Sequence, residues 1–293
     1  MDKPKQPCNW TGVACSKAVL PRGRDQGDAA LVVSNISLAY CGLQGGLDSL
    51  HFADLSHFVY LNLSGNYLWG SIPSSIGALA KLTHLDLSNN GLNGSIQQAS
   101  LDLPHLVYLK LGNNLLSGRI RSSIGAVAKL AYLDLSVNNL DGSIPTFIDL
   151  PNLVYLNFSR NALSGPIPSS IGTLTKLVVL DLSFNGLNGS IPTSIDLPNL
   201  VYLNFSRNTL SGPIPSSIGA LTKLVVLDLS FNGLNGSIPI SLGDPYDILL
   251  DSYPCHSTEN LAGFRDVQDC FKINLSHPYC RHAIRGSLII PWC

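Results

Sequence analysis

A repeat of nearly constant length constrains this chain more than any other feature. Eight asparagines, each at the end of an L-x-x-L-x-[LF]-x-x stretch, are separated by 24, 24, 24, 23, 24, 23 and 24 residues. They are Asn66, Asn90, Asn114, Asn138, Asn161, Asn185, Asn208 and Asn232. A period held this closely predicts a stack of small units, each of which contacts only its neighbours.

The units follow the pattern L-x-x-L-x-L-x-x-N-x-L-x-G-x-I-P. Its alternating leucines predict a short strand with one buried face, and units with such a face must stack to bury it. The Asn amide suits backbone groups at a turn inside the stack, while Gly and Pro suit the return path. This is the leucine-rich repeat pattern, so we expect one solenoid over 32–243. Residues 1–31 would form an incomplete N-terminal cap with paired cysteines, and 244–293 a divergent tail or second cap.

Composition and short motifs exclude several function classes. The net charge is −1, which leaves no basic footprint for nucleic acid. The sequence has no Gly-rich phosphate loop, V-A-I-K or H-R-D, and its seven histidines are scattered, so we expect no catalytic site. We expect no cofactor, no metal and no membrane span. The first residues, MDKPKQPCNW, have no apolar core of a signal peptide, and we expect the natural N-terminus to be missing.

The seven cysteines are an odd number, so at least one has no partner within the chain. We expect this to be Cys41, a buried free thiol at a position where later units carry Asn. Cys8 and Cys15 precede the first repeat and are close enough to bridge. The four cysteines of the tail allow three connectivities, and the Cys-His pairs there match no standard zinc spacing.

Nine N-x-[ST] sequons, together with the terminal cysteines, favour a secreted protein. We expect glycans at Asn35, Asn93, Asn188, Asn235 and Asn274. Glycans at Asn157 and Asn204 would crowd the strands of the central repeats.

The opening CNWTGVAC and the L-x-G-x-I-P segments resemble plant extracellular leucine-rich repeat proteins. The segment VVSNISLAYCGLQGGLDSLHFADLSHFVYLNLSGNYLWGSIP further resembles the ectodomain of receptor-like kinases of the MDIS1-interacting receptor kinase type. The resemblance implies an α/β repeat solenoid, a right-handed superhelix with a concave parallel β-sheet. It also implies an apoplastic or cell-surface location, an extracellular peptide or protein ligand, and a co-receptor kinase as partner.

The strand positions between the leucines, and the position before each ladder Asn, would line the concave face. There the sequence concentrates residue types that interfaces favour. We expect a ligand-binding face made of Tyr132, Tyr155, Arg160, Phe184, Tyr202, Arg207 and Phe231. Arg160 or Arg207 would pair with a ligand carboxylate.

A second interpretation of this face needs no ligand. Residues 153–172 and 200–219 differ at one position, Ala162 against Thr209, so a duplication alone repeats the Tyr, Arg and Phe pattern. Tyrosine is favoured on strands by propensity, and Asp181 and Asp228 would screen the arginines.

The alternatives to a receptor module are a secreted inhibitor of cell-wall hydrolases, similar to polygalacturonase inhibitors, and a non-functional receptor fragment. An ice-binding protein would need a flat Thr- or Asn-lined face, which Phe, Arg and Val interrupt here.

Overall fold

The computed structural model describes residues 7–19, 29–50, 52–96, 101, 103–146, 150–235 and 272–274. The chain divides into two compact units, Met1–Asp141 and Gly142–Cys293, which are described separately. The four tail cysteines lie outside the described residues.

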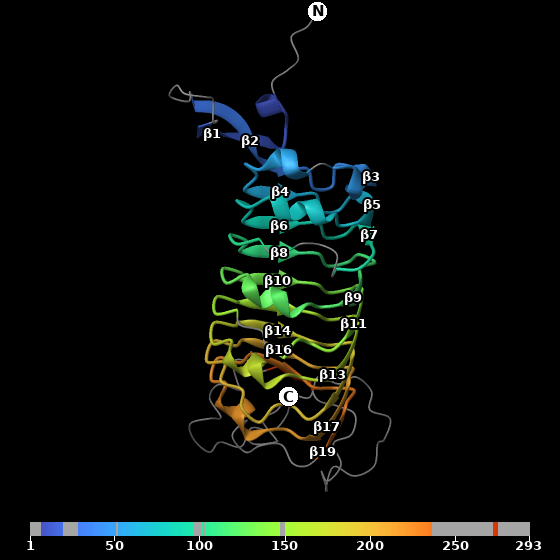
Figure 1. Ribbon diagram of the computed structural model, residues 1–293. Coiled ribbons are helices and arrows are strands. Elements are labelled where there is room, and N and C mark those ends of the chain that lie inside the picture. Colours follow the sequence, from blue (N-terminus) through green and yellow to red (C-terminus); the bar gives the residue numbers. More distant parts are fainter. Residues whose placement is uncertain are drawn as a thin grey trace, which may run out of the picture. The chain divides into compact units, whose positions relative to one another are not determined.

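The larger sheet of the first unit begins with an antiparallel pair and continues with parallel strands of three residues each, one per repeat (Figure 1). Its strands are β1 (Val13–Val19), β2 (Ala29–Ser37), β4 (Tyr60–Asn62), β6 (His84–Asp86), β8 (Tyr108–Lys110) and β10 (Tyr132–Asp134). The register is constant, since Tyr60 pairs with His84, His84 with Tyr108, and Tyr108 with Tyr132. Equivalent side chains of successive repeats therefore lie next to one another.

Short strands on the return path build smaller sheets in the same unit. They are β3 (Gln44–Gly46), β5 (Tyr67–Ser71), β7 (Gly91–Asn93), β9 (Ser117–Arg119) and β11 (Asn139–Gly142). Short 3-10 helices complete the unit, namely η1 (Pro7–Asn9), η2 (Leu47–Ser49), η3 (Phe52–Leu55), η4 (Ser74–Ala78) and η5 (Ser122–Ala126). Pro73, which has a φ of −71°, directly precedes η4, and Ile76 of this helix is fully buried. Proline sets the backbone in the same way before two helices of the second unit, whereas Arg121 takes this position before η5 with a φ of −75°.

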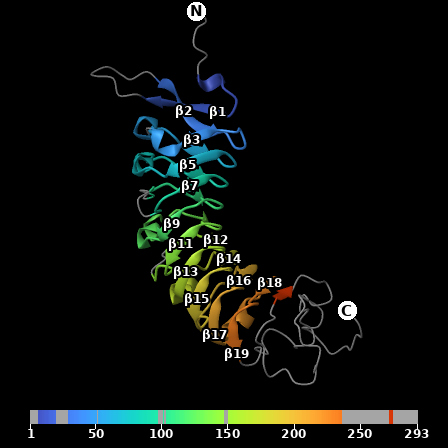
Figure 2. The same cartoon turned by 90° about the vertical axis from the view of Figure 1, so that its right-hand side faces the viewer.

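The second unit repeats this plan. Its larger sheet contains β12 (Tyr155–Asn157), β14 (Val179–Asp181), β16 (Tyr202–Asn204) and β18 (Val226–Asp228), all parallel, with β20 (Lys272–Asn274) antiparallel to β18. Figure 2 shows β14, β16 and β18 in succession. The return path carries β13 (Ala162–Pro166), β15 (Gly186–Gly189), β17 (Thr209–Pro213) and β19 (Gly233–Asn235), with η6 (Ser169–Thr173) and η7 (Ser216–Ala220). The described helices are all of the 3-10 type, so the α/β repeat expected from the sequence is formed mainly by strands.

Leucine rows and an asparagine ladder hold each stack together. The Oδ1 atom of Asn114 accepts the N–H of Leu92 at 3.0 Å, and its Nδ2 donates to the carbonyls of Leu87 at 3.1 Å and Leu111 at 3.0 Å. Asn208 makes the equivalent bonds in the second unit. One amide thereby satisfies three backbone groups that the stack removes from water.

Cys41 takes the ladder position in the first repeat, but the prediction that it is buried is wrong. The thiol is free and exposed, with its Sγ 3.4 Å from the carbonyl oxygen of Ala39. Its backbone N–H is used instead, as a donor to Asn66 Oδ1 at 3.1 Å. The physical reason is its place in the stack, because β3 is the outermost strand of its sheet among the described residues and no earlier repeat covers this turn.

Candidate functional site

The predicted ligand-binding face is divided between the two units. Tyr132 lies on β10 of the first unit, and the other six residues belong to the second. Within the second unit, Tyr155 and Tyr202 lie on β12 and β16 and are half-buried. Each phenolic oxygen accepts a hydrogen bond from an asparagine two residues later, Asn157 at 3.3 Å and Asn204 at 3.1 Å.

Arg160, Phe184, Arg207 and Phe231 lie beyond the strands rather than on them. Each occupies the turn before a ladder Asn and has a φ of 54° or 55°. This left-handed conformation is uncommon for bulky residues, and the stack enforces it because the N–H groups of this turn bond to the next repeat. The turn directs the four side chains to the rim of the sheet, where all four are exposed.

At this rim the four side chains form a continuous ladder of alternating cations and rings. The guanidinium carbon of Arg160 lies 4.3 Å from the centre of the Phe184 ring. Arg207 lies 4.8 Å from the same ring and 4.1 Å from the Phe231 ring. Phe184 is therefore held between two cations, an arrangement favoured by the negative face of the ring. We call these four residues the Arg–Phe ladder.

Neither Arg160 nor Arg207 forms a direct ion pair with an aspartate within the described part of the chain, and the expected screening by Asp181 and Asp228 stays a prediction. Arg160 and Arg207 make only ring contacts and backbone hydrogen bonds there. The Oδ1 atom of Asp228 accepts the N–H of Ser230 at 3.1 Å and its hydroxyl at 2.7 Å, so this carboxylate fixes its own turn. Most N–H donors of the two guanidinium groups are therefore available for a ligand.

The sequons at Asn157 on β12 and Asn204 on β16 are unsuited to carry glycans. Asn204 is 9% exposed, and its two amide atoms bond to Tyr202 and Ser206. Asn157 bonds to Tyr155 and to the N–H of Ser159. Asn93, Asn188 and Asn235 are exposed on the return path, Asn35 is half-buried on β2, and Asn274 belongs to β20. Glycosylation at these five positions stays a prediction.

Near the N-terminus, a disulfide joins Cys8 to Cys15, with their Cα atoms 5.5 Å apart. The bridge connects η1 to β1, next to the start of the larger sheet.

Two aromatic clusters of the first unit lie outside the predicted face, except that Tyr132 belongs to the first of them. One is a row of neighbouring rings on the strands. Tyr60 and His84 are tilted at 33° with centres 5.5 Å apart, while His84 and Tyr108 stack at 5.7 Å and Tyr108 and Tyr132 at 4.3 Å. Burial and the nearby Asp86 raise the pKa of Tyr108 above its usual 10.0. The sequence does indicate this row, because its four residues occupy the same position in successive repeats.

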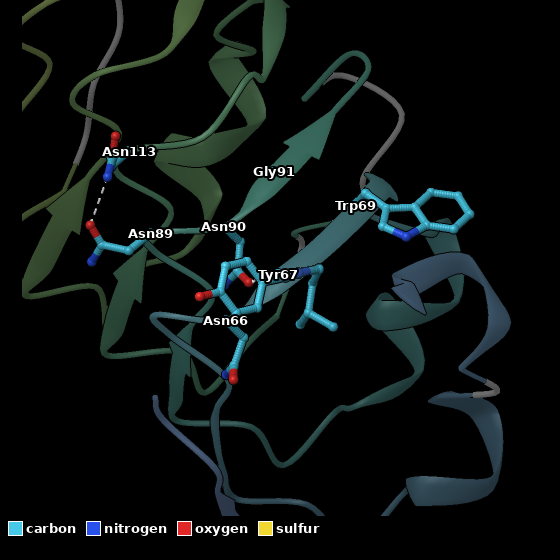
Figure 3. A pocket seen from close by; sticks show the side chains of 8 residues that line it. Asn66, Tyr67, Trp69, Asn89, Asn90, Gly91 and Asn113 are labelled. Atoms are coloured by element: carbon cyan, nitrogen blue, oxygen red, sulfur yellow. Dashed lines mark hydrogen bonds between the residues drawn. The ribbon is translucent and has the colours of Figure 1, made fainter. Parts of the chain in front are cut away.

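The other cluster comprises Tyr67 and Trp69, which are both exposed on β5. They line an open depression on the return path (Figure 3). None of the helices in the described segments has the length and hydrophobicity to cross a bilayer.

Known proteins share this architecture. The Leucine Rich Repeat family matches residues 57–79, 81–102, 129–150, 152–174, 176–197, 199–221 and 223–244, together more than half of the chain. A curated relative, the leucine-rich repeat receptor-like serine/threonine-protein kinase RGI4 of Arabidopsis thaliana, is 37% identical over 90 residues. That match covers 31% of this chain and 7% of the relative, so the chain corresponds to a small part of the whole receptor.

Solved receptor ectodomains are similar in structure. The ectodomain of the Arabidopsis thaliana receptor kinase GASSHO1/SCHENGEN3, in complex with CASPARIAN STRIP INTEGRITY FACTOR 2, matches with a TM-score of 0.70 and 31% identity over 81% of this chain and 30% of that one. The Arabidopsis receptor kinase HAESA, in complex with the peptide hormone IDA and the co-receptor SERK1, matches with a TM-score of 0.65 and 35% identity over 70% of this chain and 37% of that one. The chain belongs to the leucine-rich repeat family and is homologous to the ectodomains of plant leucine-rich repeat receptor kinases.

Proposed function

We propose that this chain is the non-catalytic ligand-binding module of a plant receptor-like protein, which binds an extracellular peptide through the Arg–Phe ladder. The observation that carries the proposal is the pair of exposed guanidinium groups that have no carboxylate partner within the described residues. An unpaired cation held in place by an aromatic ring is prepared to bind an anion with little further loss of side-chain entropy.

The neighbouring strands complete a peptide-sized surface. Tyr155 and Tyr202 lie on the same repeats as Arg160 and Arg207 and provide half-buried rings beside them. Tyr and Arg are the residue types that contribute most of the energy in protein interfaces. A peptide lying across these repeats would place a free carboxylate on an arginine and apolar side chains on the rings.

The similar ectodomains support this function, since HAESA was solved with a peptide hormone and a co-receptor. We extend to this chain an apoplastic or cell-surface location and a co-receptor kinase as partner. Nothing in the described residues favours the inhibitor of cell-wall hydrolases or the non-functional fragment over this proposal.

The test is calorimetric titration of the secreted chain with a panel of plant signalling peptides, each with a free and an amidated C-terminus. For a peptide that binds, we expect Arg207→Ala and amidation each to weaken binding about tenfold or more, the cost of one charge-assisted hydrogen bond. The control is Lys176→Ala, because Lys176 is an exposed cation whose Nζ bonds to Asn152 instead. Failure of the whole panel to bind, or equal affinity of Arg207→Ala, would contradict the proposal.

A further inference from the structure

The first unit contains an open depression of about 450 Å³ that the proposed peptide site does not use. Its lining residues are Asn66, Tyr67, Leu68, Trp69, Asn89, Asn90, Gly91 and Asn113, none of which is charged. In Figure 3 the Asn89–Asn113 pair lies at one end, the Trp69 indole stands at the other, and the Tyr67 ring lies between them. The site therefore combines two aromatic side chains with a pair of surface amides.

The two aromatic side chains have no packing role that the repeat requires. Tyr67 is 68% exposed and Trp69 is 58% exposed. At the position of Trp69 the other repeats carry small or polar residues, such as Asn93, Ser117 and Asp141. Aromatic side chains that gather on a protein surface are a feature of many binding sites.

The strands on both sides leave the indole uncovered. Trp69 pairs with Gly46 on β3 and with Gly91 on β7. A Cβ atom added at Gly46 would lie 3.4 Å from the indole ring, so the ring lies directly over this glycine. Because neither neighbour has a side chain, a flat ligand can reach the aromatic surface.

The amide pair provides directed hydrogen-bonding groups. Asn113 Nδ2 donates to Asn89 Oδ1 at 2.9 Å, and Asn89 Nδ2 contacts Ser88 Oγ at 3.3 Å. Asn113 Oδ1, the Tyr67 hydroxyl and the Trp69 indole N–H have no partner among the residues that the structure describes. These three groups offer an acceptor, a donor and a group that does both. By contrast, Asn66 and Asn90 use their amides within the ladder.

We propose that this depression binds a neutral oligosaccharide. The C–H face of a sugar ring carries partial positive charge and stacks on the negative face of an aromatic ring, while its hydroxyls bond to amides. The uncharged lining disfavours ions, and the carboxylate of Asp48 beside Gly46 and Gly70 further disfavours an anionic ligand. An open, shallow site with few polar groups also suits an extended chain better than a small enclosed metabolite.

The test uses the full chain with Asn93→Gln, which removes an exposed sequon on β7 near the site. Two further changes, Trp10→Phe and Trp292→Phe, leave Trp69 as the single tryptophan. We would titrate this protein with cellohexaose, mannohexaose and a released high-mannose N-glycan, and record both calorimetry and Trp69 fluorescence. The first two probes represent free glycans and the third a glycan carried by a partner protein.

We expect at least one neutral probe to bind and to shift the Trp69 emission. In the calorimeter, Trp69→Ala and Asn113→Ala should each weaken that binding, by about tenfold for Trp69→Ala. The matched control is Leu115→Ala, because Leu115 is 64% exposed at the repeat position of Tyr67 and lies outside the depression.

Three results would overturn the proposal: no neutral probe binds at millimolar concentration, Trp69→Ala leaves the affinity unchanged, or hexagalacturonate binds as tightly as the neutral probes. Peptide binding at the Arg–Phe ladder of the second unit is measured separately with Arg207→Ala, so either proposal can fail without the other.

Discussion

The two units share one backbone plan but place their aromatic side chains at different repeat positions. In the first unit the rings of Tyr60, His84, Tyr108 and Tyr132 contact one another in a row on the strands, while the turn position carries Gly65, Asn89, Asn113 and Val137. In the second unit the strand position alternates Tyr with Val, and the turn position carries the Arg–Phe ladder. A repeat sets the backbone and the core, and it leaves each column of surface side chains free to diverge.

The largest expected effect concerns the asparagine ladder, which the two units have in common. Asn114→Ala in the first unit and Asn208→Ala in the second should each lower the free energy of unfolding by on the order of 3 kcal/mol, because buried backbone groups lose their partner. Urea denaturation followed by circular dichroism measures this change.

The control for this pair is Asn139→Ala, an exposed asparagine for which no side-chain hydrogen bond is found in the described segments. A cost for Asn114→Ala more than twice that for Asn208→Ala would show that the ladder is not equivalent in the two units.

The next prediction compares one strand position, occupied by tyrosine in both units, between the first unit and the second. Tyr108 stacks between His84 and Tyr132, whereas Tyr202 lies between Val179 and Val226. We expect Tyr108→Ala to destabilise the protein by roughly 1 kcal/mol more than Tyr202→Ala, the contribution of aromatic pairs beyond their buried area. The same denaturation experiment measures the difference, and equal costs would mean that ring stacking adds nothing to packing.

Val137 offers a stabilising change at the turn position. Its φ is 53°, a conformation that is costly for a β-branched residue and mild for asparagine. Val137→Asn should raise the free energy of unfolding by about 1 kcal/mol, and its amide would extend the Asn89–Asn113 pair by one repeat. The control is Val137→Ala, which removes the branched side chain but keeps a Cβ at this φ. It should raise the free energy of unfolding by less than Val137→Asn.

An effect of similar or smaller size is expected for the Arg–Phe ladder. Arg207 contacts two rings and Arg160 contacts one, so Arg207→Ala should cost about 1 kcal/mol and Arg160→Ala about half as much. A double-mutant cycle with Phe231→Ala isolates the contact at 4.1 Å. A coupling energy of zero would show that the Phe231 ring does not hold Arg207 in place for a ligand.

The smallest effect is common to both units and appears at alkaline pH. Burial raises the pKa of Tyr108 and Tyr202 above the ordinary value of 10.0. Because the neutral form is favoured in the folded state, their contribution to stability is complete below pH 10 and is lost as the pH rises through the raised values. Absorbance titration at about 295 nm should show delayed ionisation that Tyr108→Phe and Tyr202→Phe each reduce, and unchanged curves would contradict it.

Much of this architecture could be predicted from the sequence. The spacing of Asn66 to Asn232 indicated the stacked strands and the ladder, because a period of 23 or 24 residues leaves each amide above the turn of the preceding unit. The same spacing placed Phe184 next to both Arg160 and Arg207. The exposure of Cys41 could not be predicted, since it depends on what covers the first turn and not on the repeat register.

The sequence by itself therefore determined the repeat, its core and which side chains share a column, since these depend on local periodicity. The tertiary structure alone decided where each column faces. The left-handed turn carries Arg160 and its equivalents away from the strands to the rim, and paired glycines uncover Trp69. Both effects arise from contacts between repeats, because hydrogen bonds to the next unit set the turn and neighbouring strands set what covers a ring.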